Sequence, residues 1–330
     1  MKKILMIATG GTIASRAGED GLAPEMDSSG LLGRVPEICE FCRPDSVQIF
    51  NIDSTNITPD HWVKIAETIR DNYDAYDGFV VCHGTDTMAY TAAVLSYMIQ
   101  HSPKPIVLTG SQKPIDKEDT DARINLRDSF LYASSENAAD VVIVFQGKVI
   151  AGTRAKKIRT KSFNAFDSVD FPELARIRDG KIIPYIVTPK GDKPEFHLTL
   201  NRKVGLINLT PGMDSEILDV YFRYNDAVVL SGYGTGGIPE GDYYGFYEII
   251  ESWKNKGKTL VVTTQVQSEG SDMSIYRVGR GLKKRFSLLE SYDMTYESIL
   301  AKLMWILGQT KDEEEIRKLF YKSINYDLIG

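Results

Sequence analysis

The sequence is poor in cysteine and histidine, with three cysteines and four histidines among 330 residues. Three cysteines cannot all pair within one chain, which excludes a disulfide framework and favours the cytoplasm. Cys39 and Cys42 form a lone C-x-x-C, but no second cysteine or histidine pair accompanies it at zinc-ligand spacing. The histidines are scattered as well, so we expect no metal and no zinc-dependent hydrolysis.

Net positive charge and long apolar runs are also lacking. The formal net charge is −6, so no overall positive field would attract nucleic acid or anionic lipid. The basic run at residues 280–285 has no interleaved aromatics and fits a solvated surface. No apolar run reaches the length of a membrane span, and residues 4–8 are too few for a signal peptide. We therefore expect a small-molecule partner, without nucleic acid or membrane.

Short apolar runs rich in β-branched residues alternate with segments of helical period. Unalternated runs of this kind are typical of strands buried on both faces, and their alternation with helices predicts a parallel sheet. The expected helices are residues 60–71, 86–100, 296–307 and 312–321. The expected strands are residues 4–8, 47–52, 79–82, 106–108, 141–145, 204–209, 227–230 and 259–262.

A polar stretch rich in proline and glycine, residues 184–202, interrupts this pattern. We predict an α/β protein with a larger N-terminal domain, built on a mostly parallel sheet with flanking helices, and a smaller C-terminal α/β domain. The expected bounds are residues 1–188 and 204–330, with a linker at 189–203. Residues 15–33 are rich in glycine and serine, and we expect a lid over a site.

Polar residues follow the first and third of these apolar runs. In open α/β sheets, ligands bind beyond the carboxyl ends of the strands. Gly11 and Thr12 follow the first run, and Gly84, Thr85 and Asp86 follow residues 79–82. Each cluster alone also fits a tight turn or a helix N-cap, but two hydroxyl-bearing strand ends favour a site.

Two further clusters occupy similar positions. Asp53, Ser54 and Thr55 follow residues 47–52 and could hold a carboxylate through hydroxyl and main-chain N–H groups. Lys157 lies in a basic segment after residues 148–151. The alternatives are an Asx-type loop for the first cluster and a solvated turn for the second.

Together these segments resemble the bacterial L-asparaginases, and most closely their cytoplasmic type I branch. The two signature segments are Thr9-Gly10-Gly11-Thr12-Ile13-Ala14 and His83-Gly84-Thr85-Asp86-Thr87. The likeness extends along nearly the whole chain. It includes Asp53-Ser54-Thr55, Thr109-Gly110-Ser111-Gln112, Lys157 and Lys302-Leu303-Met304-Trp305.

The resemblance implies hydrolysis of the side-chain amide of L-asparagine to L-aspartate and ammonia, with weaker activity on glutamine and no cofactor. Thr12 would attack the amide carbon and form an acyl-enzyme. Thr85 would form a proton relay with Lys157 and Asp86. Asp86 would also bind the α-ammonium group of the substrate. The expected substrate-binding residues are Ser54, Thr55, Asp53, Gly84, Gly11 and Ser111.

One departure from the family pattern concerns the lid. Many relatives carry a tyrosine after a glycine there, whereas Leu22 follows Gly21 in this chain. The resemblance implies a homo-oligomer, either a close dimer or a dimer of dimers. Tyr276 or Tyr233 of a neighbouring subunit could then orient Thr12. Val266 stands where some type I enzymes have an allosteric cysteine, which disfavours that regulation.

Three other functions remain open. Residues 232–237 fit the G-x-G-x-x-G spacing of dinucleotide-binding oxidoreductases, although Pro239 interrupts the expected helix. The archaeal amidotransferase subunit that forms glutaminyl-tRNA shares the fold, but as a family it carries an extra domain before the first signature. A non-catalytic amino-acid-binding protein is the third. Both threonines meet the chemical requirement for the first attack, and asparagine and glutamine both stay candidate substrates.

Overall fold

The computed structural model describes residues 1–18, 21–241, 245–275, 277–286 and 288–329. The chain divides into two compact units, Met1–Leu198 and Thr199–Gly330.

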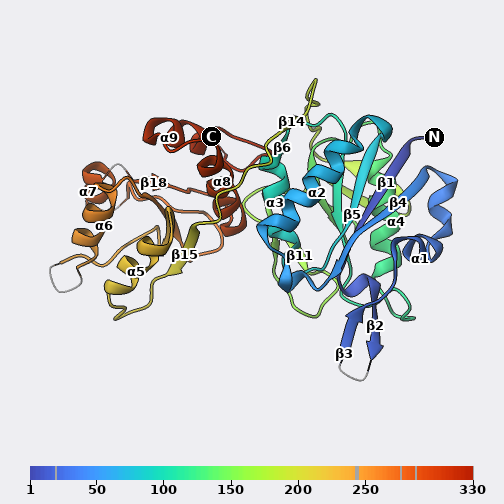
Figure 1. The fold of residues 1–330 in the computed structure, drawn as a ribbon, viewed down its shortest axis with the longest axis horizontal. Helices are drawn as coiled ribbons and strands as arrows, with labels where there is room; N and C mark the ends of the chain where they lie inside the picture. The colour runs from blue at the N-terminus through green and yellow to red at the C-terminus, as the bar shows by residue number, and fades with distance from the viewer. Residues whose placement is uncertain (19–20, 242–244, 276, 287, 330) are drawn as a thin grey trace. The chain divides into compact units, whose positions relative to one another are not determined.

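The first unit is built on a mixed sheet with the strand order β13-β12-β9-β8-β7-β5-β1-β4 among its described residues (Figure 1). Neighbouring strands from β8 to β4 are parallel, whereas the pairs β8–β9, β9–β12 and β12–β13 are antiparallel. The strands are β1 (Lys3–Gly10), β4 (Arg43–Ile52), β5 (Gly78–Cys82), β7 (Ile106–Thr109), β8 (Val141–Phe145), β9 (Lys148–Ala151), β12 (Ala175–Arg178) and β13 (Lys181–Pro184).

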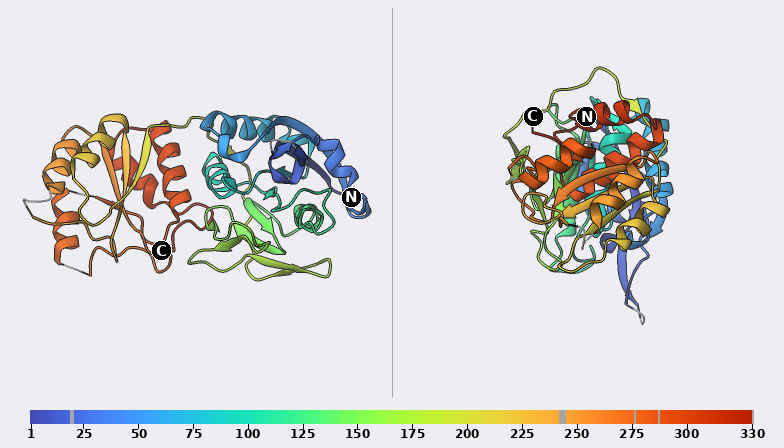
Figure 2. Two further views of the ribbon diagram at one scale, coloured as in Figure 1. Left: turned by 90° about the horizontal axis from the view of Figure 1, so that it is seen from below. Right: turned by 90° about the vertical axis from the view of Figure 1, so that its left-hand side faces the viewer.

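Helices cover both faces of this sheet (Figures 1 and 2). Every residue of β5, β7 and β8 is buried, as expected for strands covered on both sides. The helices are α1 (Ser28–Gly33), α2 (Pro59–Asp71), α3 (Met88–Met98) and α4 (Ala122–Ala133), with short 3₁₀ helices η1 (Thr12–Ala14), η2 (Pro36–Glu40), η3 (Ser54–Asn56) and η4 (Tyr73–Ala75).

Three small two-stranded sheets complete the unit: β2 (Ser15–Gly18) with β3 (Gly21–Pro24), β6 (Ile99–Gln100) with β14 (Glu195–Phe196), and β10 (Ala155–Lys157) with β11 (Phe166–Ser168). The first of these sheets and α1 lie within residues 15–33, which the glycine content alone did not reveal. The helix expected at residues 86–100 is shorter at both ends. Residues 83–87 have no regular secondary structure, and Ile99 leaves the helix to pair with Phe196.

The second unit contains the parallel sheet β15-β16-β17-β18 and five helices within its described residues. The strands are β15 (Val204–Asn208), β16 (Ala227–Gly232), β17 (Thr259–Thr264) and β18 (Leu289–Glu290). The helices are α5 (Glu216–Tyr224), α6 (Phe246–Lys254), α7 (Arg277–Phe286), α8 (Tyr296–Gln309) and α9 (Glu313–Tyr321). The predicted fold class, a larger and mostly parallel unit followed by a smaller α/β unit, is confirmed.

The glycine-rich segment after β16 folds differently from a dinucleotide-binding turn. Its main chain closes on itself, with Tyr233 N donating to Gly237 O at 2.9 Å and Gly237 N donating to Tyr233 O at 2.6 Å. The next helix, α6, begins only at Phe246. A phosphate-binding turn would pass directly from strand to helix, so this segment lacks that geometry.

No helix in the described ranges is long and apolar enough to cross a membrane. The described residues also contain no group of three or more histidine, cysteine, aspartate or glutamate side chains arranged to hold a metal ion.

Candidate active site

Four strand ends bring the predicted residues to one edge of the large sheet. The register pairs Gly10 with Ile52, Ala8 with Cys82, and Cys82 with Thr109, so β1, β4, β5 and β7 end at neighbouring positions. The segments after these strands carry Thr12, Ser54, Thr85 and Ser111 respectively. Parallel strands thus place residues from four distant parts of the sequence at the carboxyl edge of the sheet.

The loops that carry Thr12 and Thr85 contact each other through glycine. Gly11 has φ 81°, and a Cβ atom added there would lie 2.5 Å from both Cα and N of Gly84. A Cβ atom on Gly84 would lie 2.6 Å from Ser54 Oγ. Only residues without side chains permit this approach, which brings three of the predicted segments together.

A buried hydrogen-bond chain holds the Gly84 main chain. His83 is fully buried, and its Nδ1 lies 2.7 Å from the carbonyl oxygen of Gly84. Burial lowers the pKa of His83 to about 4, so the ring is neutral near pH 7. Because the carbonyl accepts, Nδ1 carries the proton, and Nε2 accepts from Thr91 Oγ1 at 2.9 Å. Thr91 in turn accepts from Trp62 Nε1 at 2.9 Å, so this side-chain network fixes the peptide next to Thr85.

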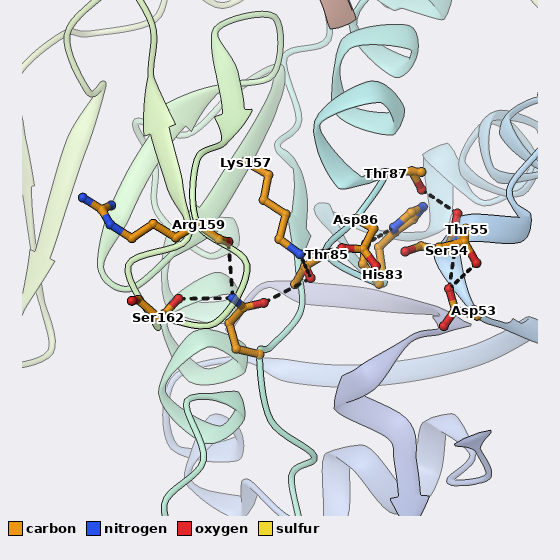
Figure 3. Close-up of polar contacts among 12 residues, drawn as sticks. Asp53, Ser54, Thr55, His83, Thr85, Asp86, Thr87, Lys157, Arg159 and Ser162 are labelled. Atoms are coloured by element: carbon orange, nitrogen blue, oxygen red, sulfur yellow. Dashed lines mark hydrogen bonds and ion pairs between the residues drawn. The ribbon is translucent and has the colours of Figure 1, made fainter. Parts of the chain in front are cut away.

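Thr85, Asp86 and Lys157 form a hydrogen-bonded cluster (Figure 3). Lys157 Nζ donates to Thr85 Oγ1 at 2.8 Å and forms an ion pair with Asp86 Oδ1 at 2.6 Å. Thr85 is buried, whereas the Asp86 side chain is 57% exposed and accessible to a ligand. Lys157 ends β10, far from the other two residues in sequence, and its cation lies beside a hydroxyl at the edge of the sheet.

Asp53 organises the segment after β4. Its carboxylate accepts from the main-chain N–H and from the hydroxyl of Thr55, both at 2.8 Å, and it caps η3. Thr87 Oγ1 donates to Ser54 O at 2.8 Å and links this segment to the turn after β5. Ser54 is buried and Thr55 is exposed, so the two hydroxyls have different surroundings.

The other predicted residues have contacts different from those of the Thr85, Asp86 and Lys157 cluster. The Ser111 hydroxyl donates to the carbonyl of Lys113 within its own turn. Thr12 begins η1 and is half-buried, and no hydrogen bond joins its side chain to another residue in the described part of the chain. Tyr233 belongs to the second unit, where it packs against the hydrophobic core. Tyr276 lies outside the described residues.

Sequence reasoning missed the role of one residue at this edge. Gln112 accepts a hydrogen bond from Thr85 Oγ1 through its side-chain Oε1 at 3.2 Å. The signal was available, since Gln112 is a polar residue shortly after the apolar strand β7, like the other site residues. The sequence pattern favoured its neighbour Ser111, because a hydroxyl side chain is a commoner catalytic group than an amide.

This two-unit fold with a threonine–lysine–aspartate cluster at the sheet edge matches known families. Residues 3–187 match the family model described as "Asparaginase, N-terminal", and residues 203–320 match "Glutaminase/Asparaginase C-terminal domain". The chain therefore belongs to the asparaginase/glutaminase family.

Three relatives illustrate the range of this similarity. The chain is 37% identical to the L-asparaginase of Thermococcus kodakarensis over 99% of both chains, and the solved structure of that protein superimposes with a TM-score of 0.93. It is 33% identical to L-asparaginase 1 of Escherichia coli K12, over 99% of this chain and 98% of the relative. It is 34% identical to a glutamyl-tRNA(Gln) amidotransferase subunit of Pyrococcus abyssi, over 97% of this chain and 75% of the relative.

Proposed function

We propose that the protein is an L-asparaginase that hydrolyses the side-chain amide of L-asparagine to L-aspartate and ammonia, with weaker activity on glutamine. The observation that carries this proposal is the contact between Lys157 and the buried Thr85, on a loop that touches the Thr12 loop through Gly11 and Gly84. Amide hydrolysis near neutral pH needs a nucleophile, a proton carrier and a way to release ammonia. These residues provide hydroxyls and a lysine for the first two.

In the proposed reaction Thr12 Oγ1 attacks the amide carbon of the substrate. A carbon–oxygen bond forms, the carbon–nitrogen bond breaks, and the proton lost by Thr12 leaves with the nitrogen as ammonia. Water then attacks the resulting ester, restores the Thr12 hydroxyl and releases aspartate. Thr85 and Lys157 carry the proton between these steps, a contribution of about 10²–10⁴ in rate for a well-placed acid or base.

The substrate is a zwitterion, and both of its charges need partners in the site. We assign the α-ammonium group to Asp86, whose carboxylate is exposed beside Lys157. We assign the α-carboxylate to Ser54 and Thr55, with Asp53 holding Thr55 in place. Gly11 and Gly84 allow the loops to approach, and Ser111 lines the edge after β7.

We also propose that the protein belongs to the cytoplasmic type I branch and that its domains are residues 1–188 and 204–330, with a linker at 189–203. The three free cysteines support the assignment to the cytoplasm. We further propose a homo-oligomer, a close dimer or a dimer of dimers, in which Tyr233 or Tyr276 of a neighbouring subunit orients Thr12. Full activity of protein diluted to monomers would contradict this last assignment.

The test is ammonia release from asparagine and from glutamine by purified protein, without added metal or nucleotide. We expect activity on asparagine that Thr12→Ala and Thr85→Ala both abolish. Thr68→Ala is the matched control, because it removes a hydroxyl that bonds to the α2 main chain. A folded protein that releases no ammonia from asparagine would refute the proposal. Mass spectrometry of a trapped acyl-enzyme identifies the nucleophile, and an adduct on Thr85 would exclude Thr12.

A further inference from the structure

The orientation of the Gln112 amide follows from its neighbours. The side-chain Nε2 donates to the carbonyl oxygens of Ser162 at 3.2 Å and Arg159 at 3.5 Å. A carbonyl oxygen only accepts hydrogen bonds, so the amide nitrogen must face these two groups. The amide oxygen therefore faces Thr85.

This orientation determines the position of the hydroxyl proton of Thr85. Gln112 Oε1 carries no hydrogen, so Thr85 Oγ1 is the donor in the 3.2 Å contact between them. Thr85 has one hydroxyl proton, and Lys157 Nζ must therefore donate in the 2.8 Å contact on the other side. The hydrogen bonds run in one direction, from Lys157 to Thr85 to Gln112.

The main-chain N–H of Gln112 is also hydrogen-bonded. Its N–H donates to both carboxylate oxygens of Asp121, at 3.1 and 3.0 Å. Asp121 is 1% exposed and also accepts from Asn125 Nδ2 at 3.1 Å, and Asn125 donates to Gly110 O at 3.0 Å. Gln112 is therefore anchored at both ends, and neither contact depends on a bound substrate.

We propose that Gln112 is a positioning residue that sets the direction of the Thr85 hydroxyl and holds its oxygen against Lys157. This role rests on the proposed function. In the ligand-free arrangement Thr85 offers a lone pair to Lys157 and its proton to Gln112. For the relay to operate, Lys157 first releases one proton to water; Thr85 then takes a proton from the attacking group and passes its own proton to the resulting amine, which returns the lysine to its ammonium form. The bond to Gln112 is released while the hydroxyl turns from the amide to the amine, and the proton that Thr85 has received then restores this bond.

Gln112→Met tests the proposal, because methionine has a similar length but no strong hydrogen-bonding group. We expect kcat on asparagine to fall about tenfold, the size of one lost neutral hydrogen bond, with KM unchanged within about twofold. Gln48→Met is the matched control. Gln48 is also half-buried, and its amide also donates to two carbonyls, Ala8 O at 3.2 Å and Phe50 O at 2.7 Å. We expect the control to lose stability but to keep kcat within about twofold.

Gln112→Glu supplies a second and independent readout. The carboxylate can accept from Thr85 but cannot donate to the Ser162 and Arg159 carbonyls, so we expect a reduced kcat at neutral pH. The protonated acid has one donor and one acceptor, as the amide has on these two sides. The activity of this variant relative to the unmodified protein should therefore recover as the pH falls, whereas Gln112→Met should show no recovery.

The outcomes separate this inference from the proposed function. An unmodified protein that is inactive on asparagine overturns both. An active unmodified protein whose kcat survives Gln112→Met overturns only the role of Gln112. A fall in kcat that Gln48→Met reproduces, or a glutamate variant that does not recover at low pH, also overturns it.

Discussion

Gly11→Ala is the substitution that tests most directly how the two threonine loops are held together. Gly11 has φ 81° and ψ 179°, a conformation nearly restricted to glycine, and such strain costs about 1–3 kcal/mol for other residues. The new Cβ would also lie 2.5 Å from Cα and N of Gly84, whereas carbon atoms in contact are about 3.5–4.0 Å apart. The loops would have to separate by about 1 Å, because neither atom of Gly84 is the end of a flexible side chain.

The two costs can be combined. Overpacking adds about 1–3 kcal/mol to the backbone strain, so the total loss is about 2–6 kcal/mol. The whole free energy of unfolding of a typical domain is about 5–15 kcal/mol. We therefore expect a folded but clearly less stable variant. A displacement of about 1 Å between reacting groups can cost about a hundredfold in rate, and we expect a loss of kcat of that order.

Urea denaturation and ammonia release from asparagine measure the two effects. Gly33→Ala is the control, because Gly33 ends α1 and a Cβ there meets no atom within 4 Å. Stability and activity of the control should stay close to those of the unmodified protein. If Gly11→Ala were as stable and active as the control, the close approach of Gly11 and Gly84 would not hold the loops as we argue.

Three further predictions concern charge. Burial raises the pKa of Asp128 to about 6 from 3.8, so binding of a proton to this carboxyl stabilises the folded state fully below pH 3.8, and this stabilisation is lost as the pH rises through 6. Asp128→Asn should therefore stabilise the protein at pH 7 by up to about 3 kcal/mol but much less at pH 4. The control Asp179→Asn, at an exposed position, should give no such stabilisation. Lys302 and Asp327 are both fully buried and lie 2.7 Å apart, so Lys302→Met should cost about 3–5 kcal/mol in urea denaturation by removing the cation that pairs with a buried carboxylate. An equal loss of stability on replacing an exposed lysine would contradict this. Lys157→Met should lower kcat on asparagine by about a hundredfold or more, and normal turnover would exclude lysine from the relay.

The central parallel strands were predictable because they are buried on both faces and read as continuous apolar runs. β9, β12 and β13 were not predicted as an antiparallel extension of the sheet. β12 and β13 are only partly buried and lack such runs, and the two-residue turn between β8 and β9, at Gln146 and Gly147, has no proline to mark it. The pairing of β2 with β3 was missed for a related reason. Glycine and serine content suggests freedom of the chain but does not reveal a pairing partner.

The candidate site was predictable at the level of segments and less so at the level of contacts. Polar residues after buried strands, together with the family resemblance, pointed to Thr12, Thr85, Asp86 and Lys157. The structure places the last three in one cluster. Gln112 was missed because its amide is oriented by two main-chain carbonyls, those of Arg159 and Ser162. The pattern of side chains in the sequence does not indicate where these carbonyls lie.

Histidine is the usual choice for a general base near neutral pH, and His83 stands close to Thr85 in sequence. The structure argues against that role on three grounds. His83 is fully buried, its pKa is lowered to about 4, and both ring nitrogens are engaged, one with the Gly84 carbonyl and the other with Thr91. A proton carrier must exchange its proton with substrate or water, which this ring cannot reach. Lys157 contacts Thr85 directly and pairs with the exposed Asp86, so we propose the lysine as the proton carrier at this edge of the sheet, whereas the histidine holds the Gly84 main chain in place.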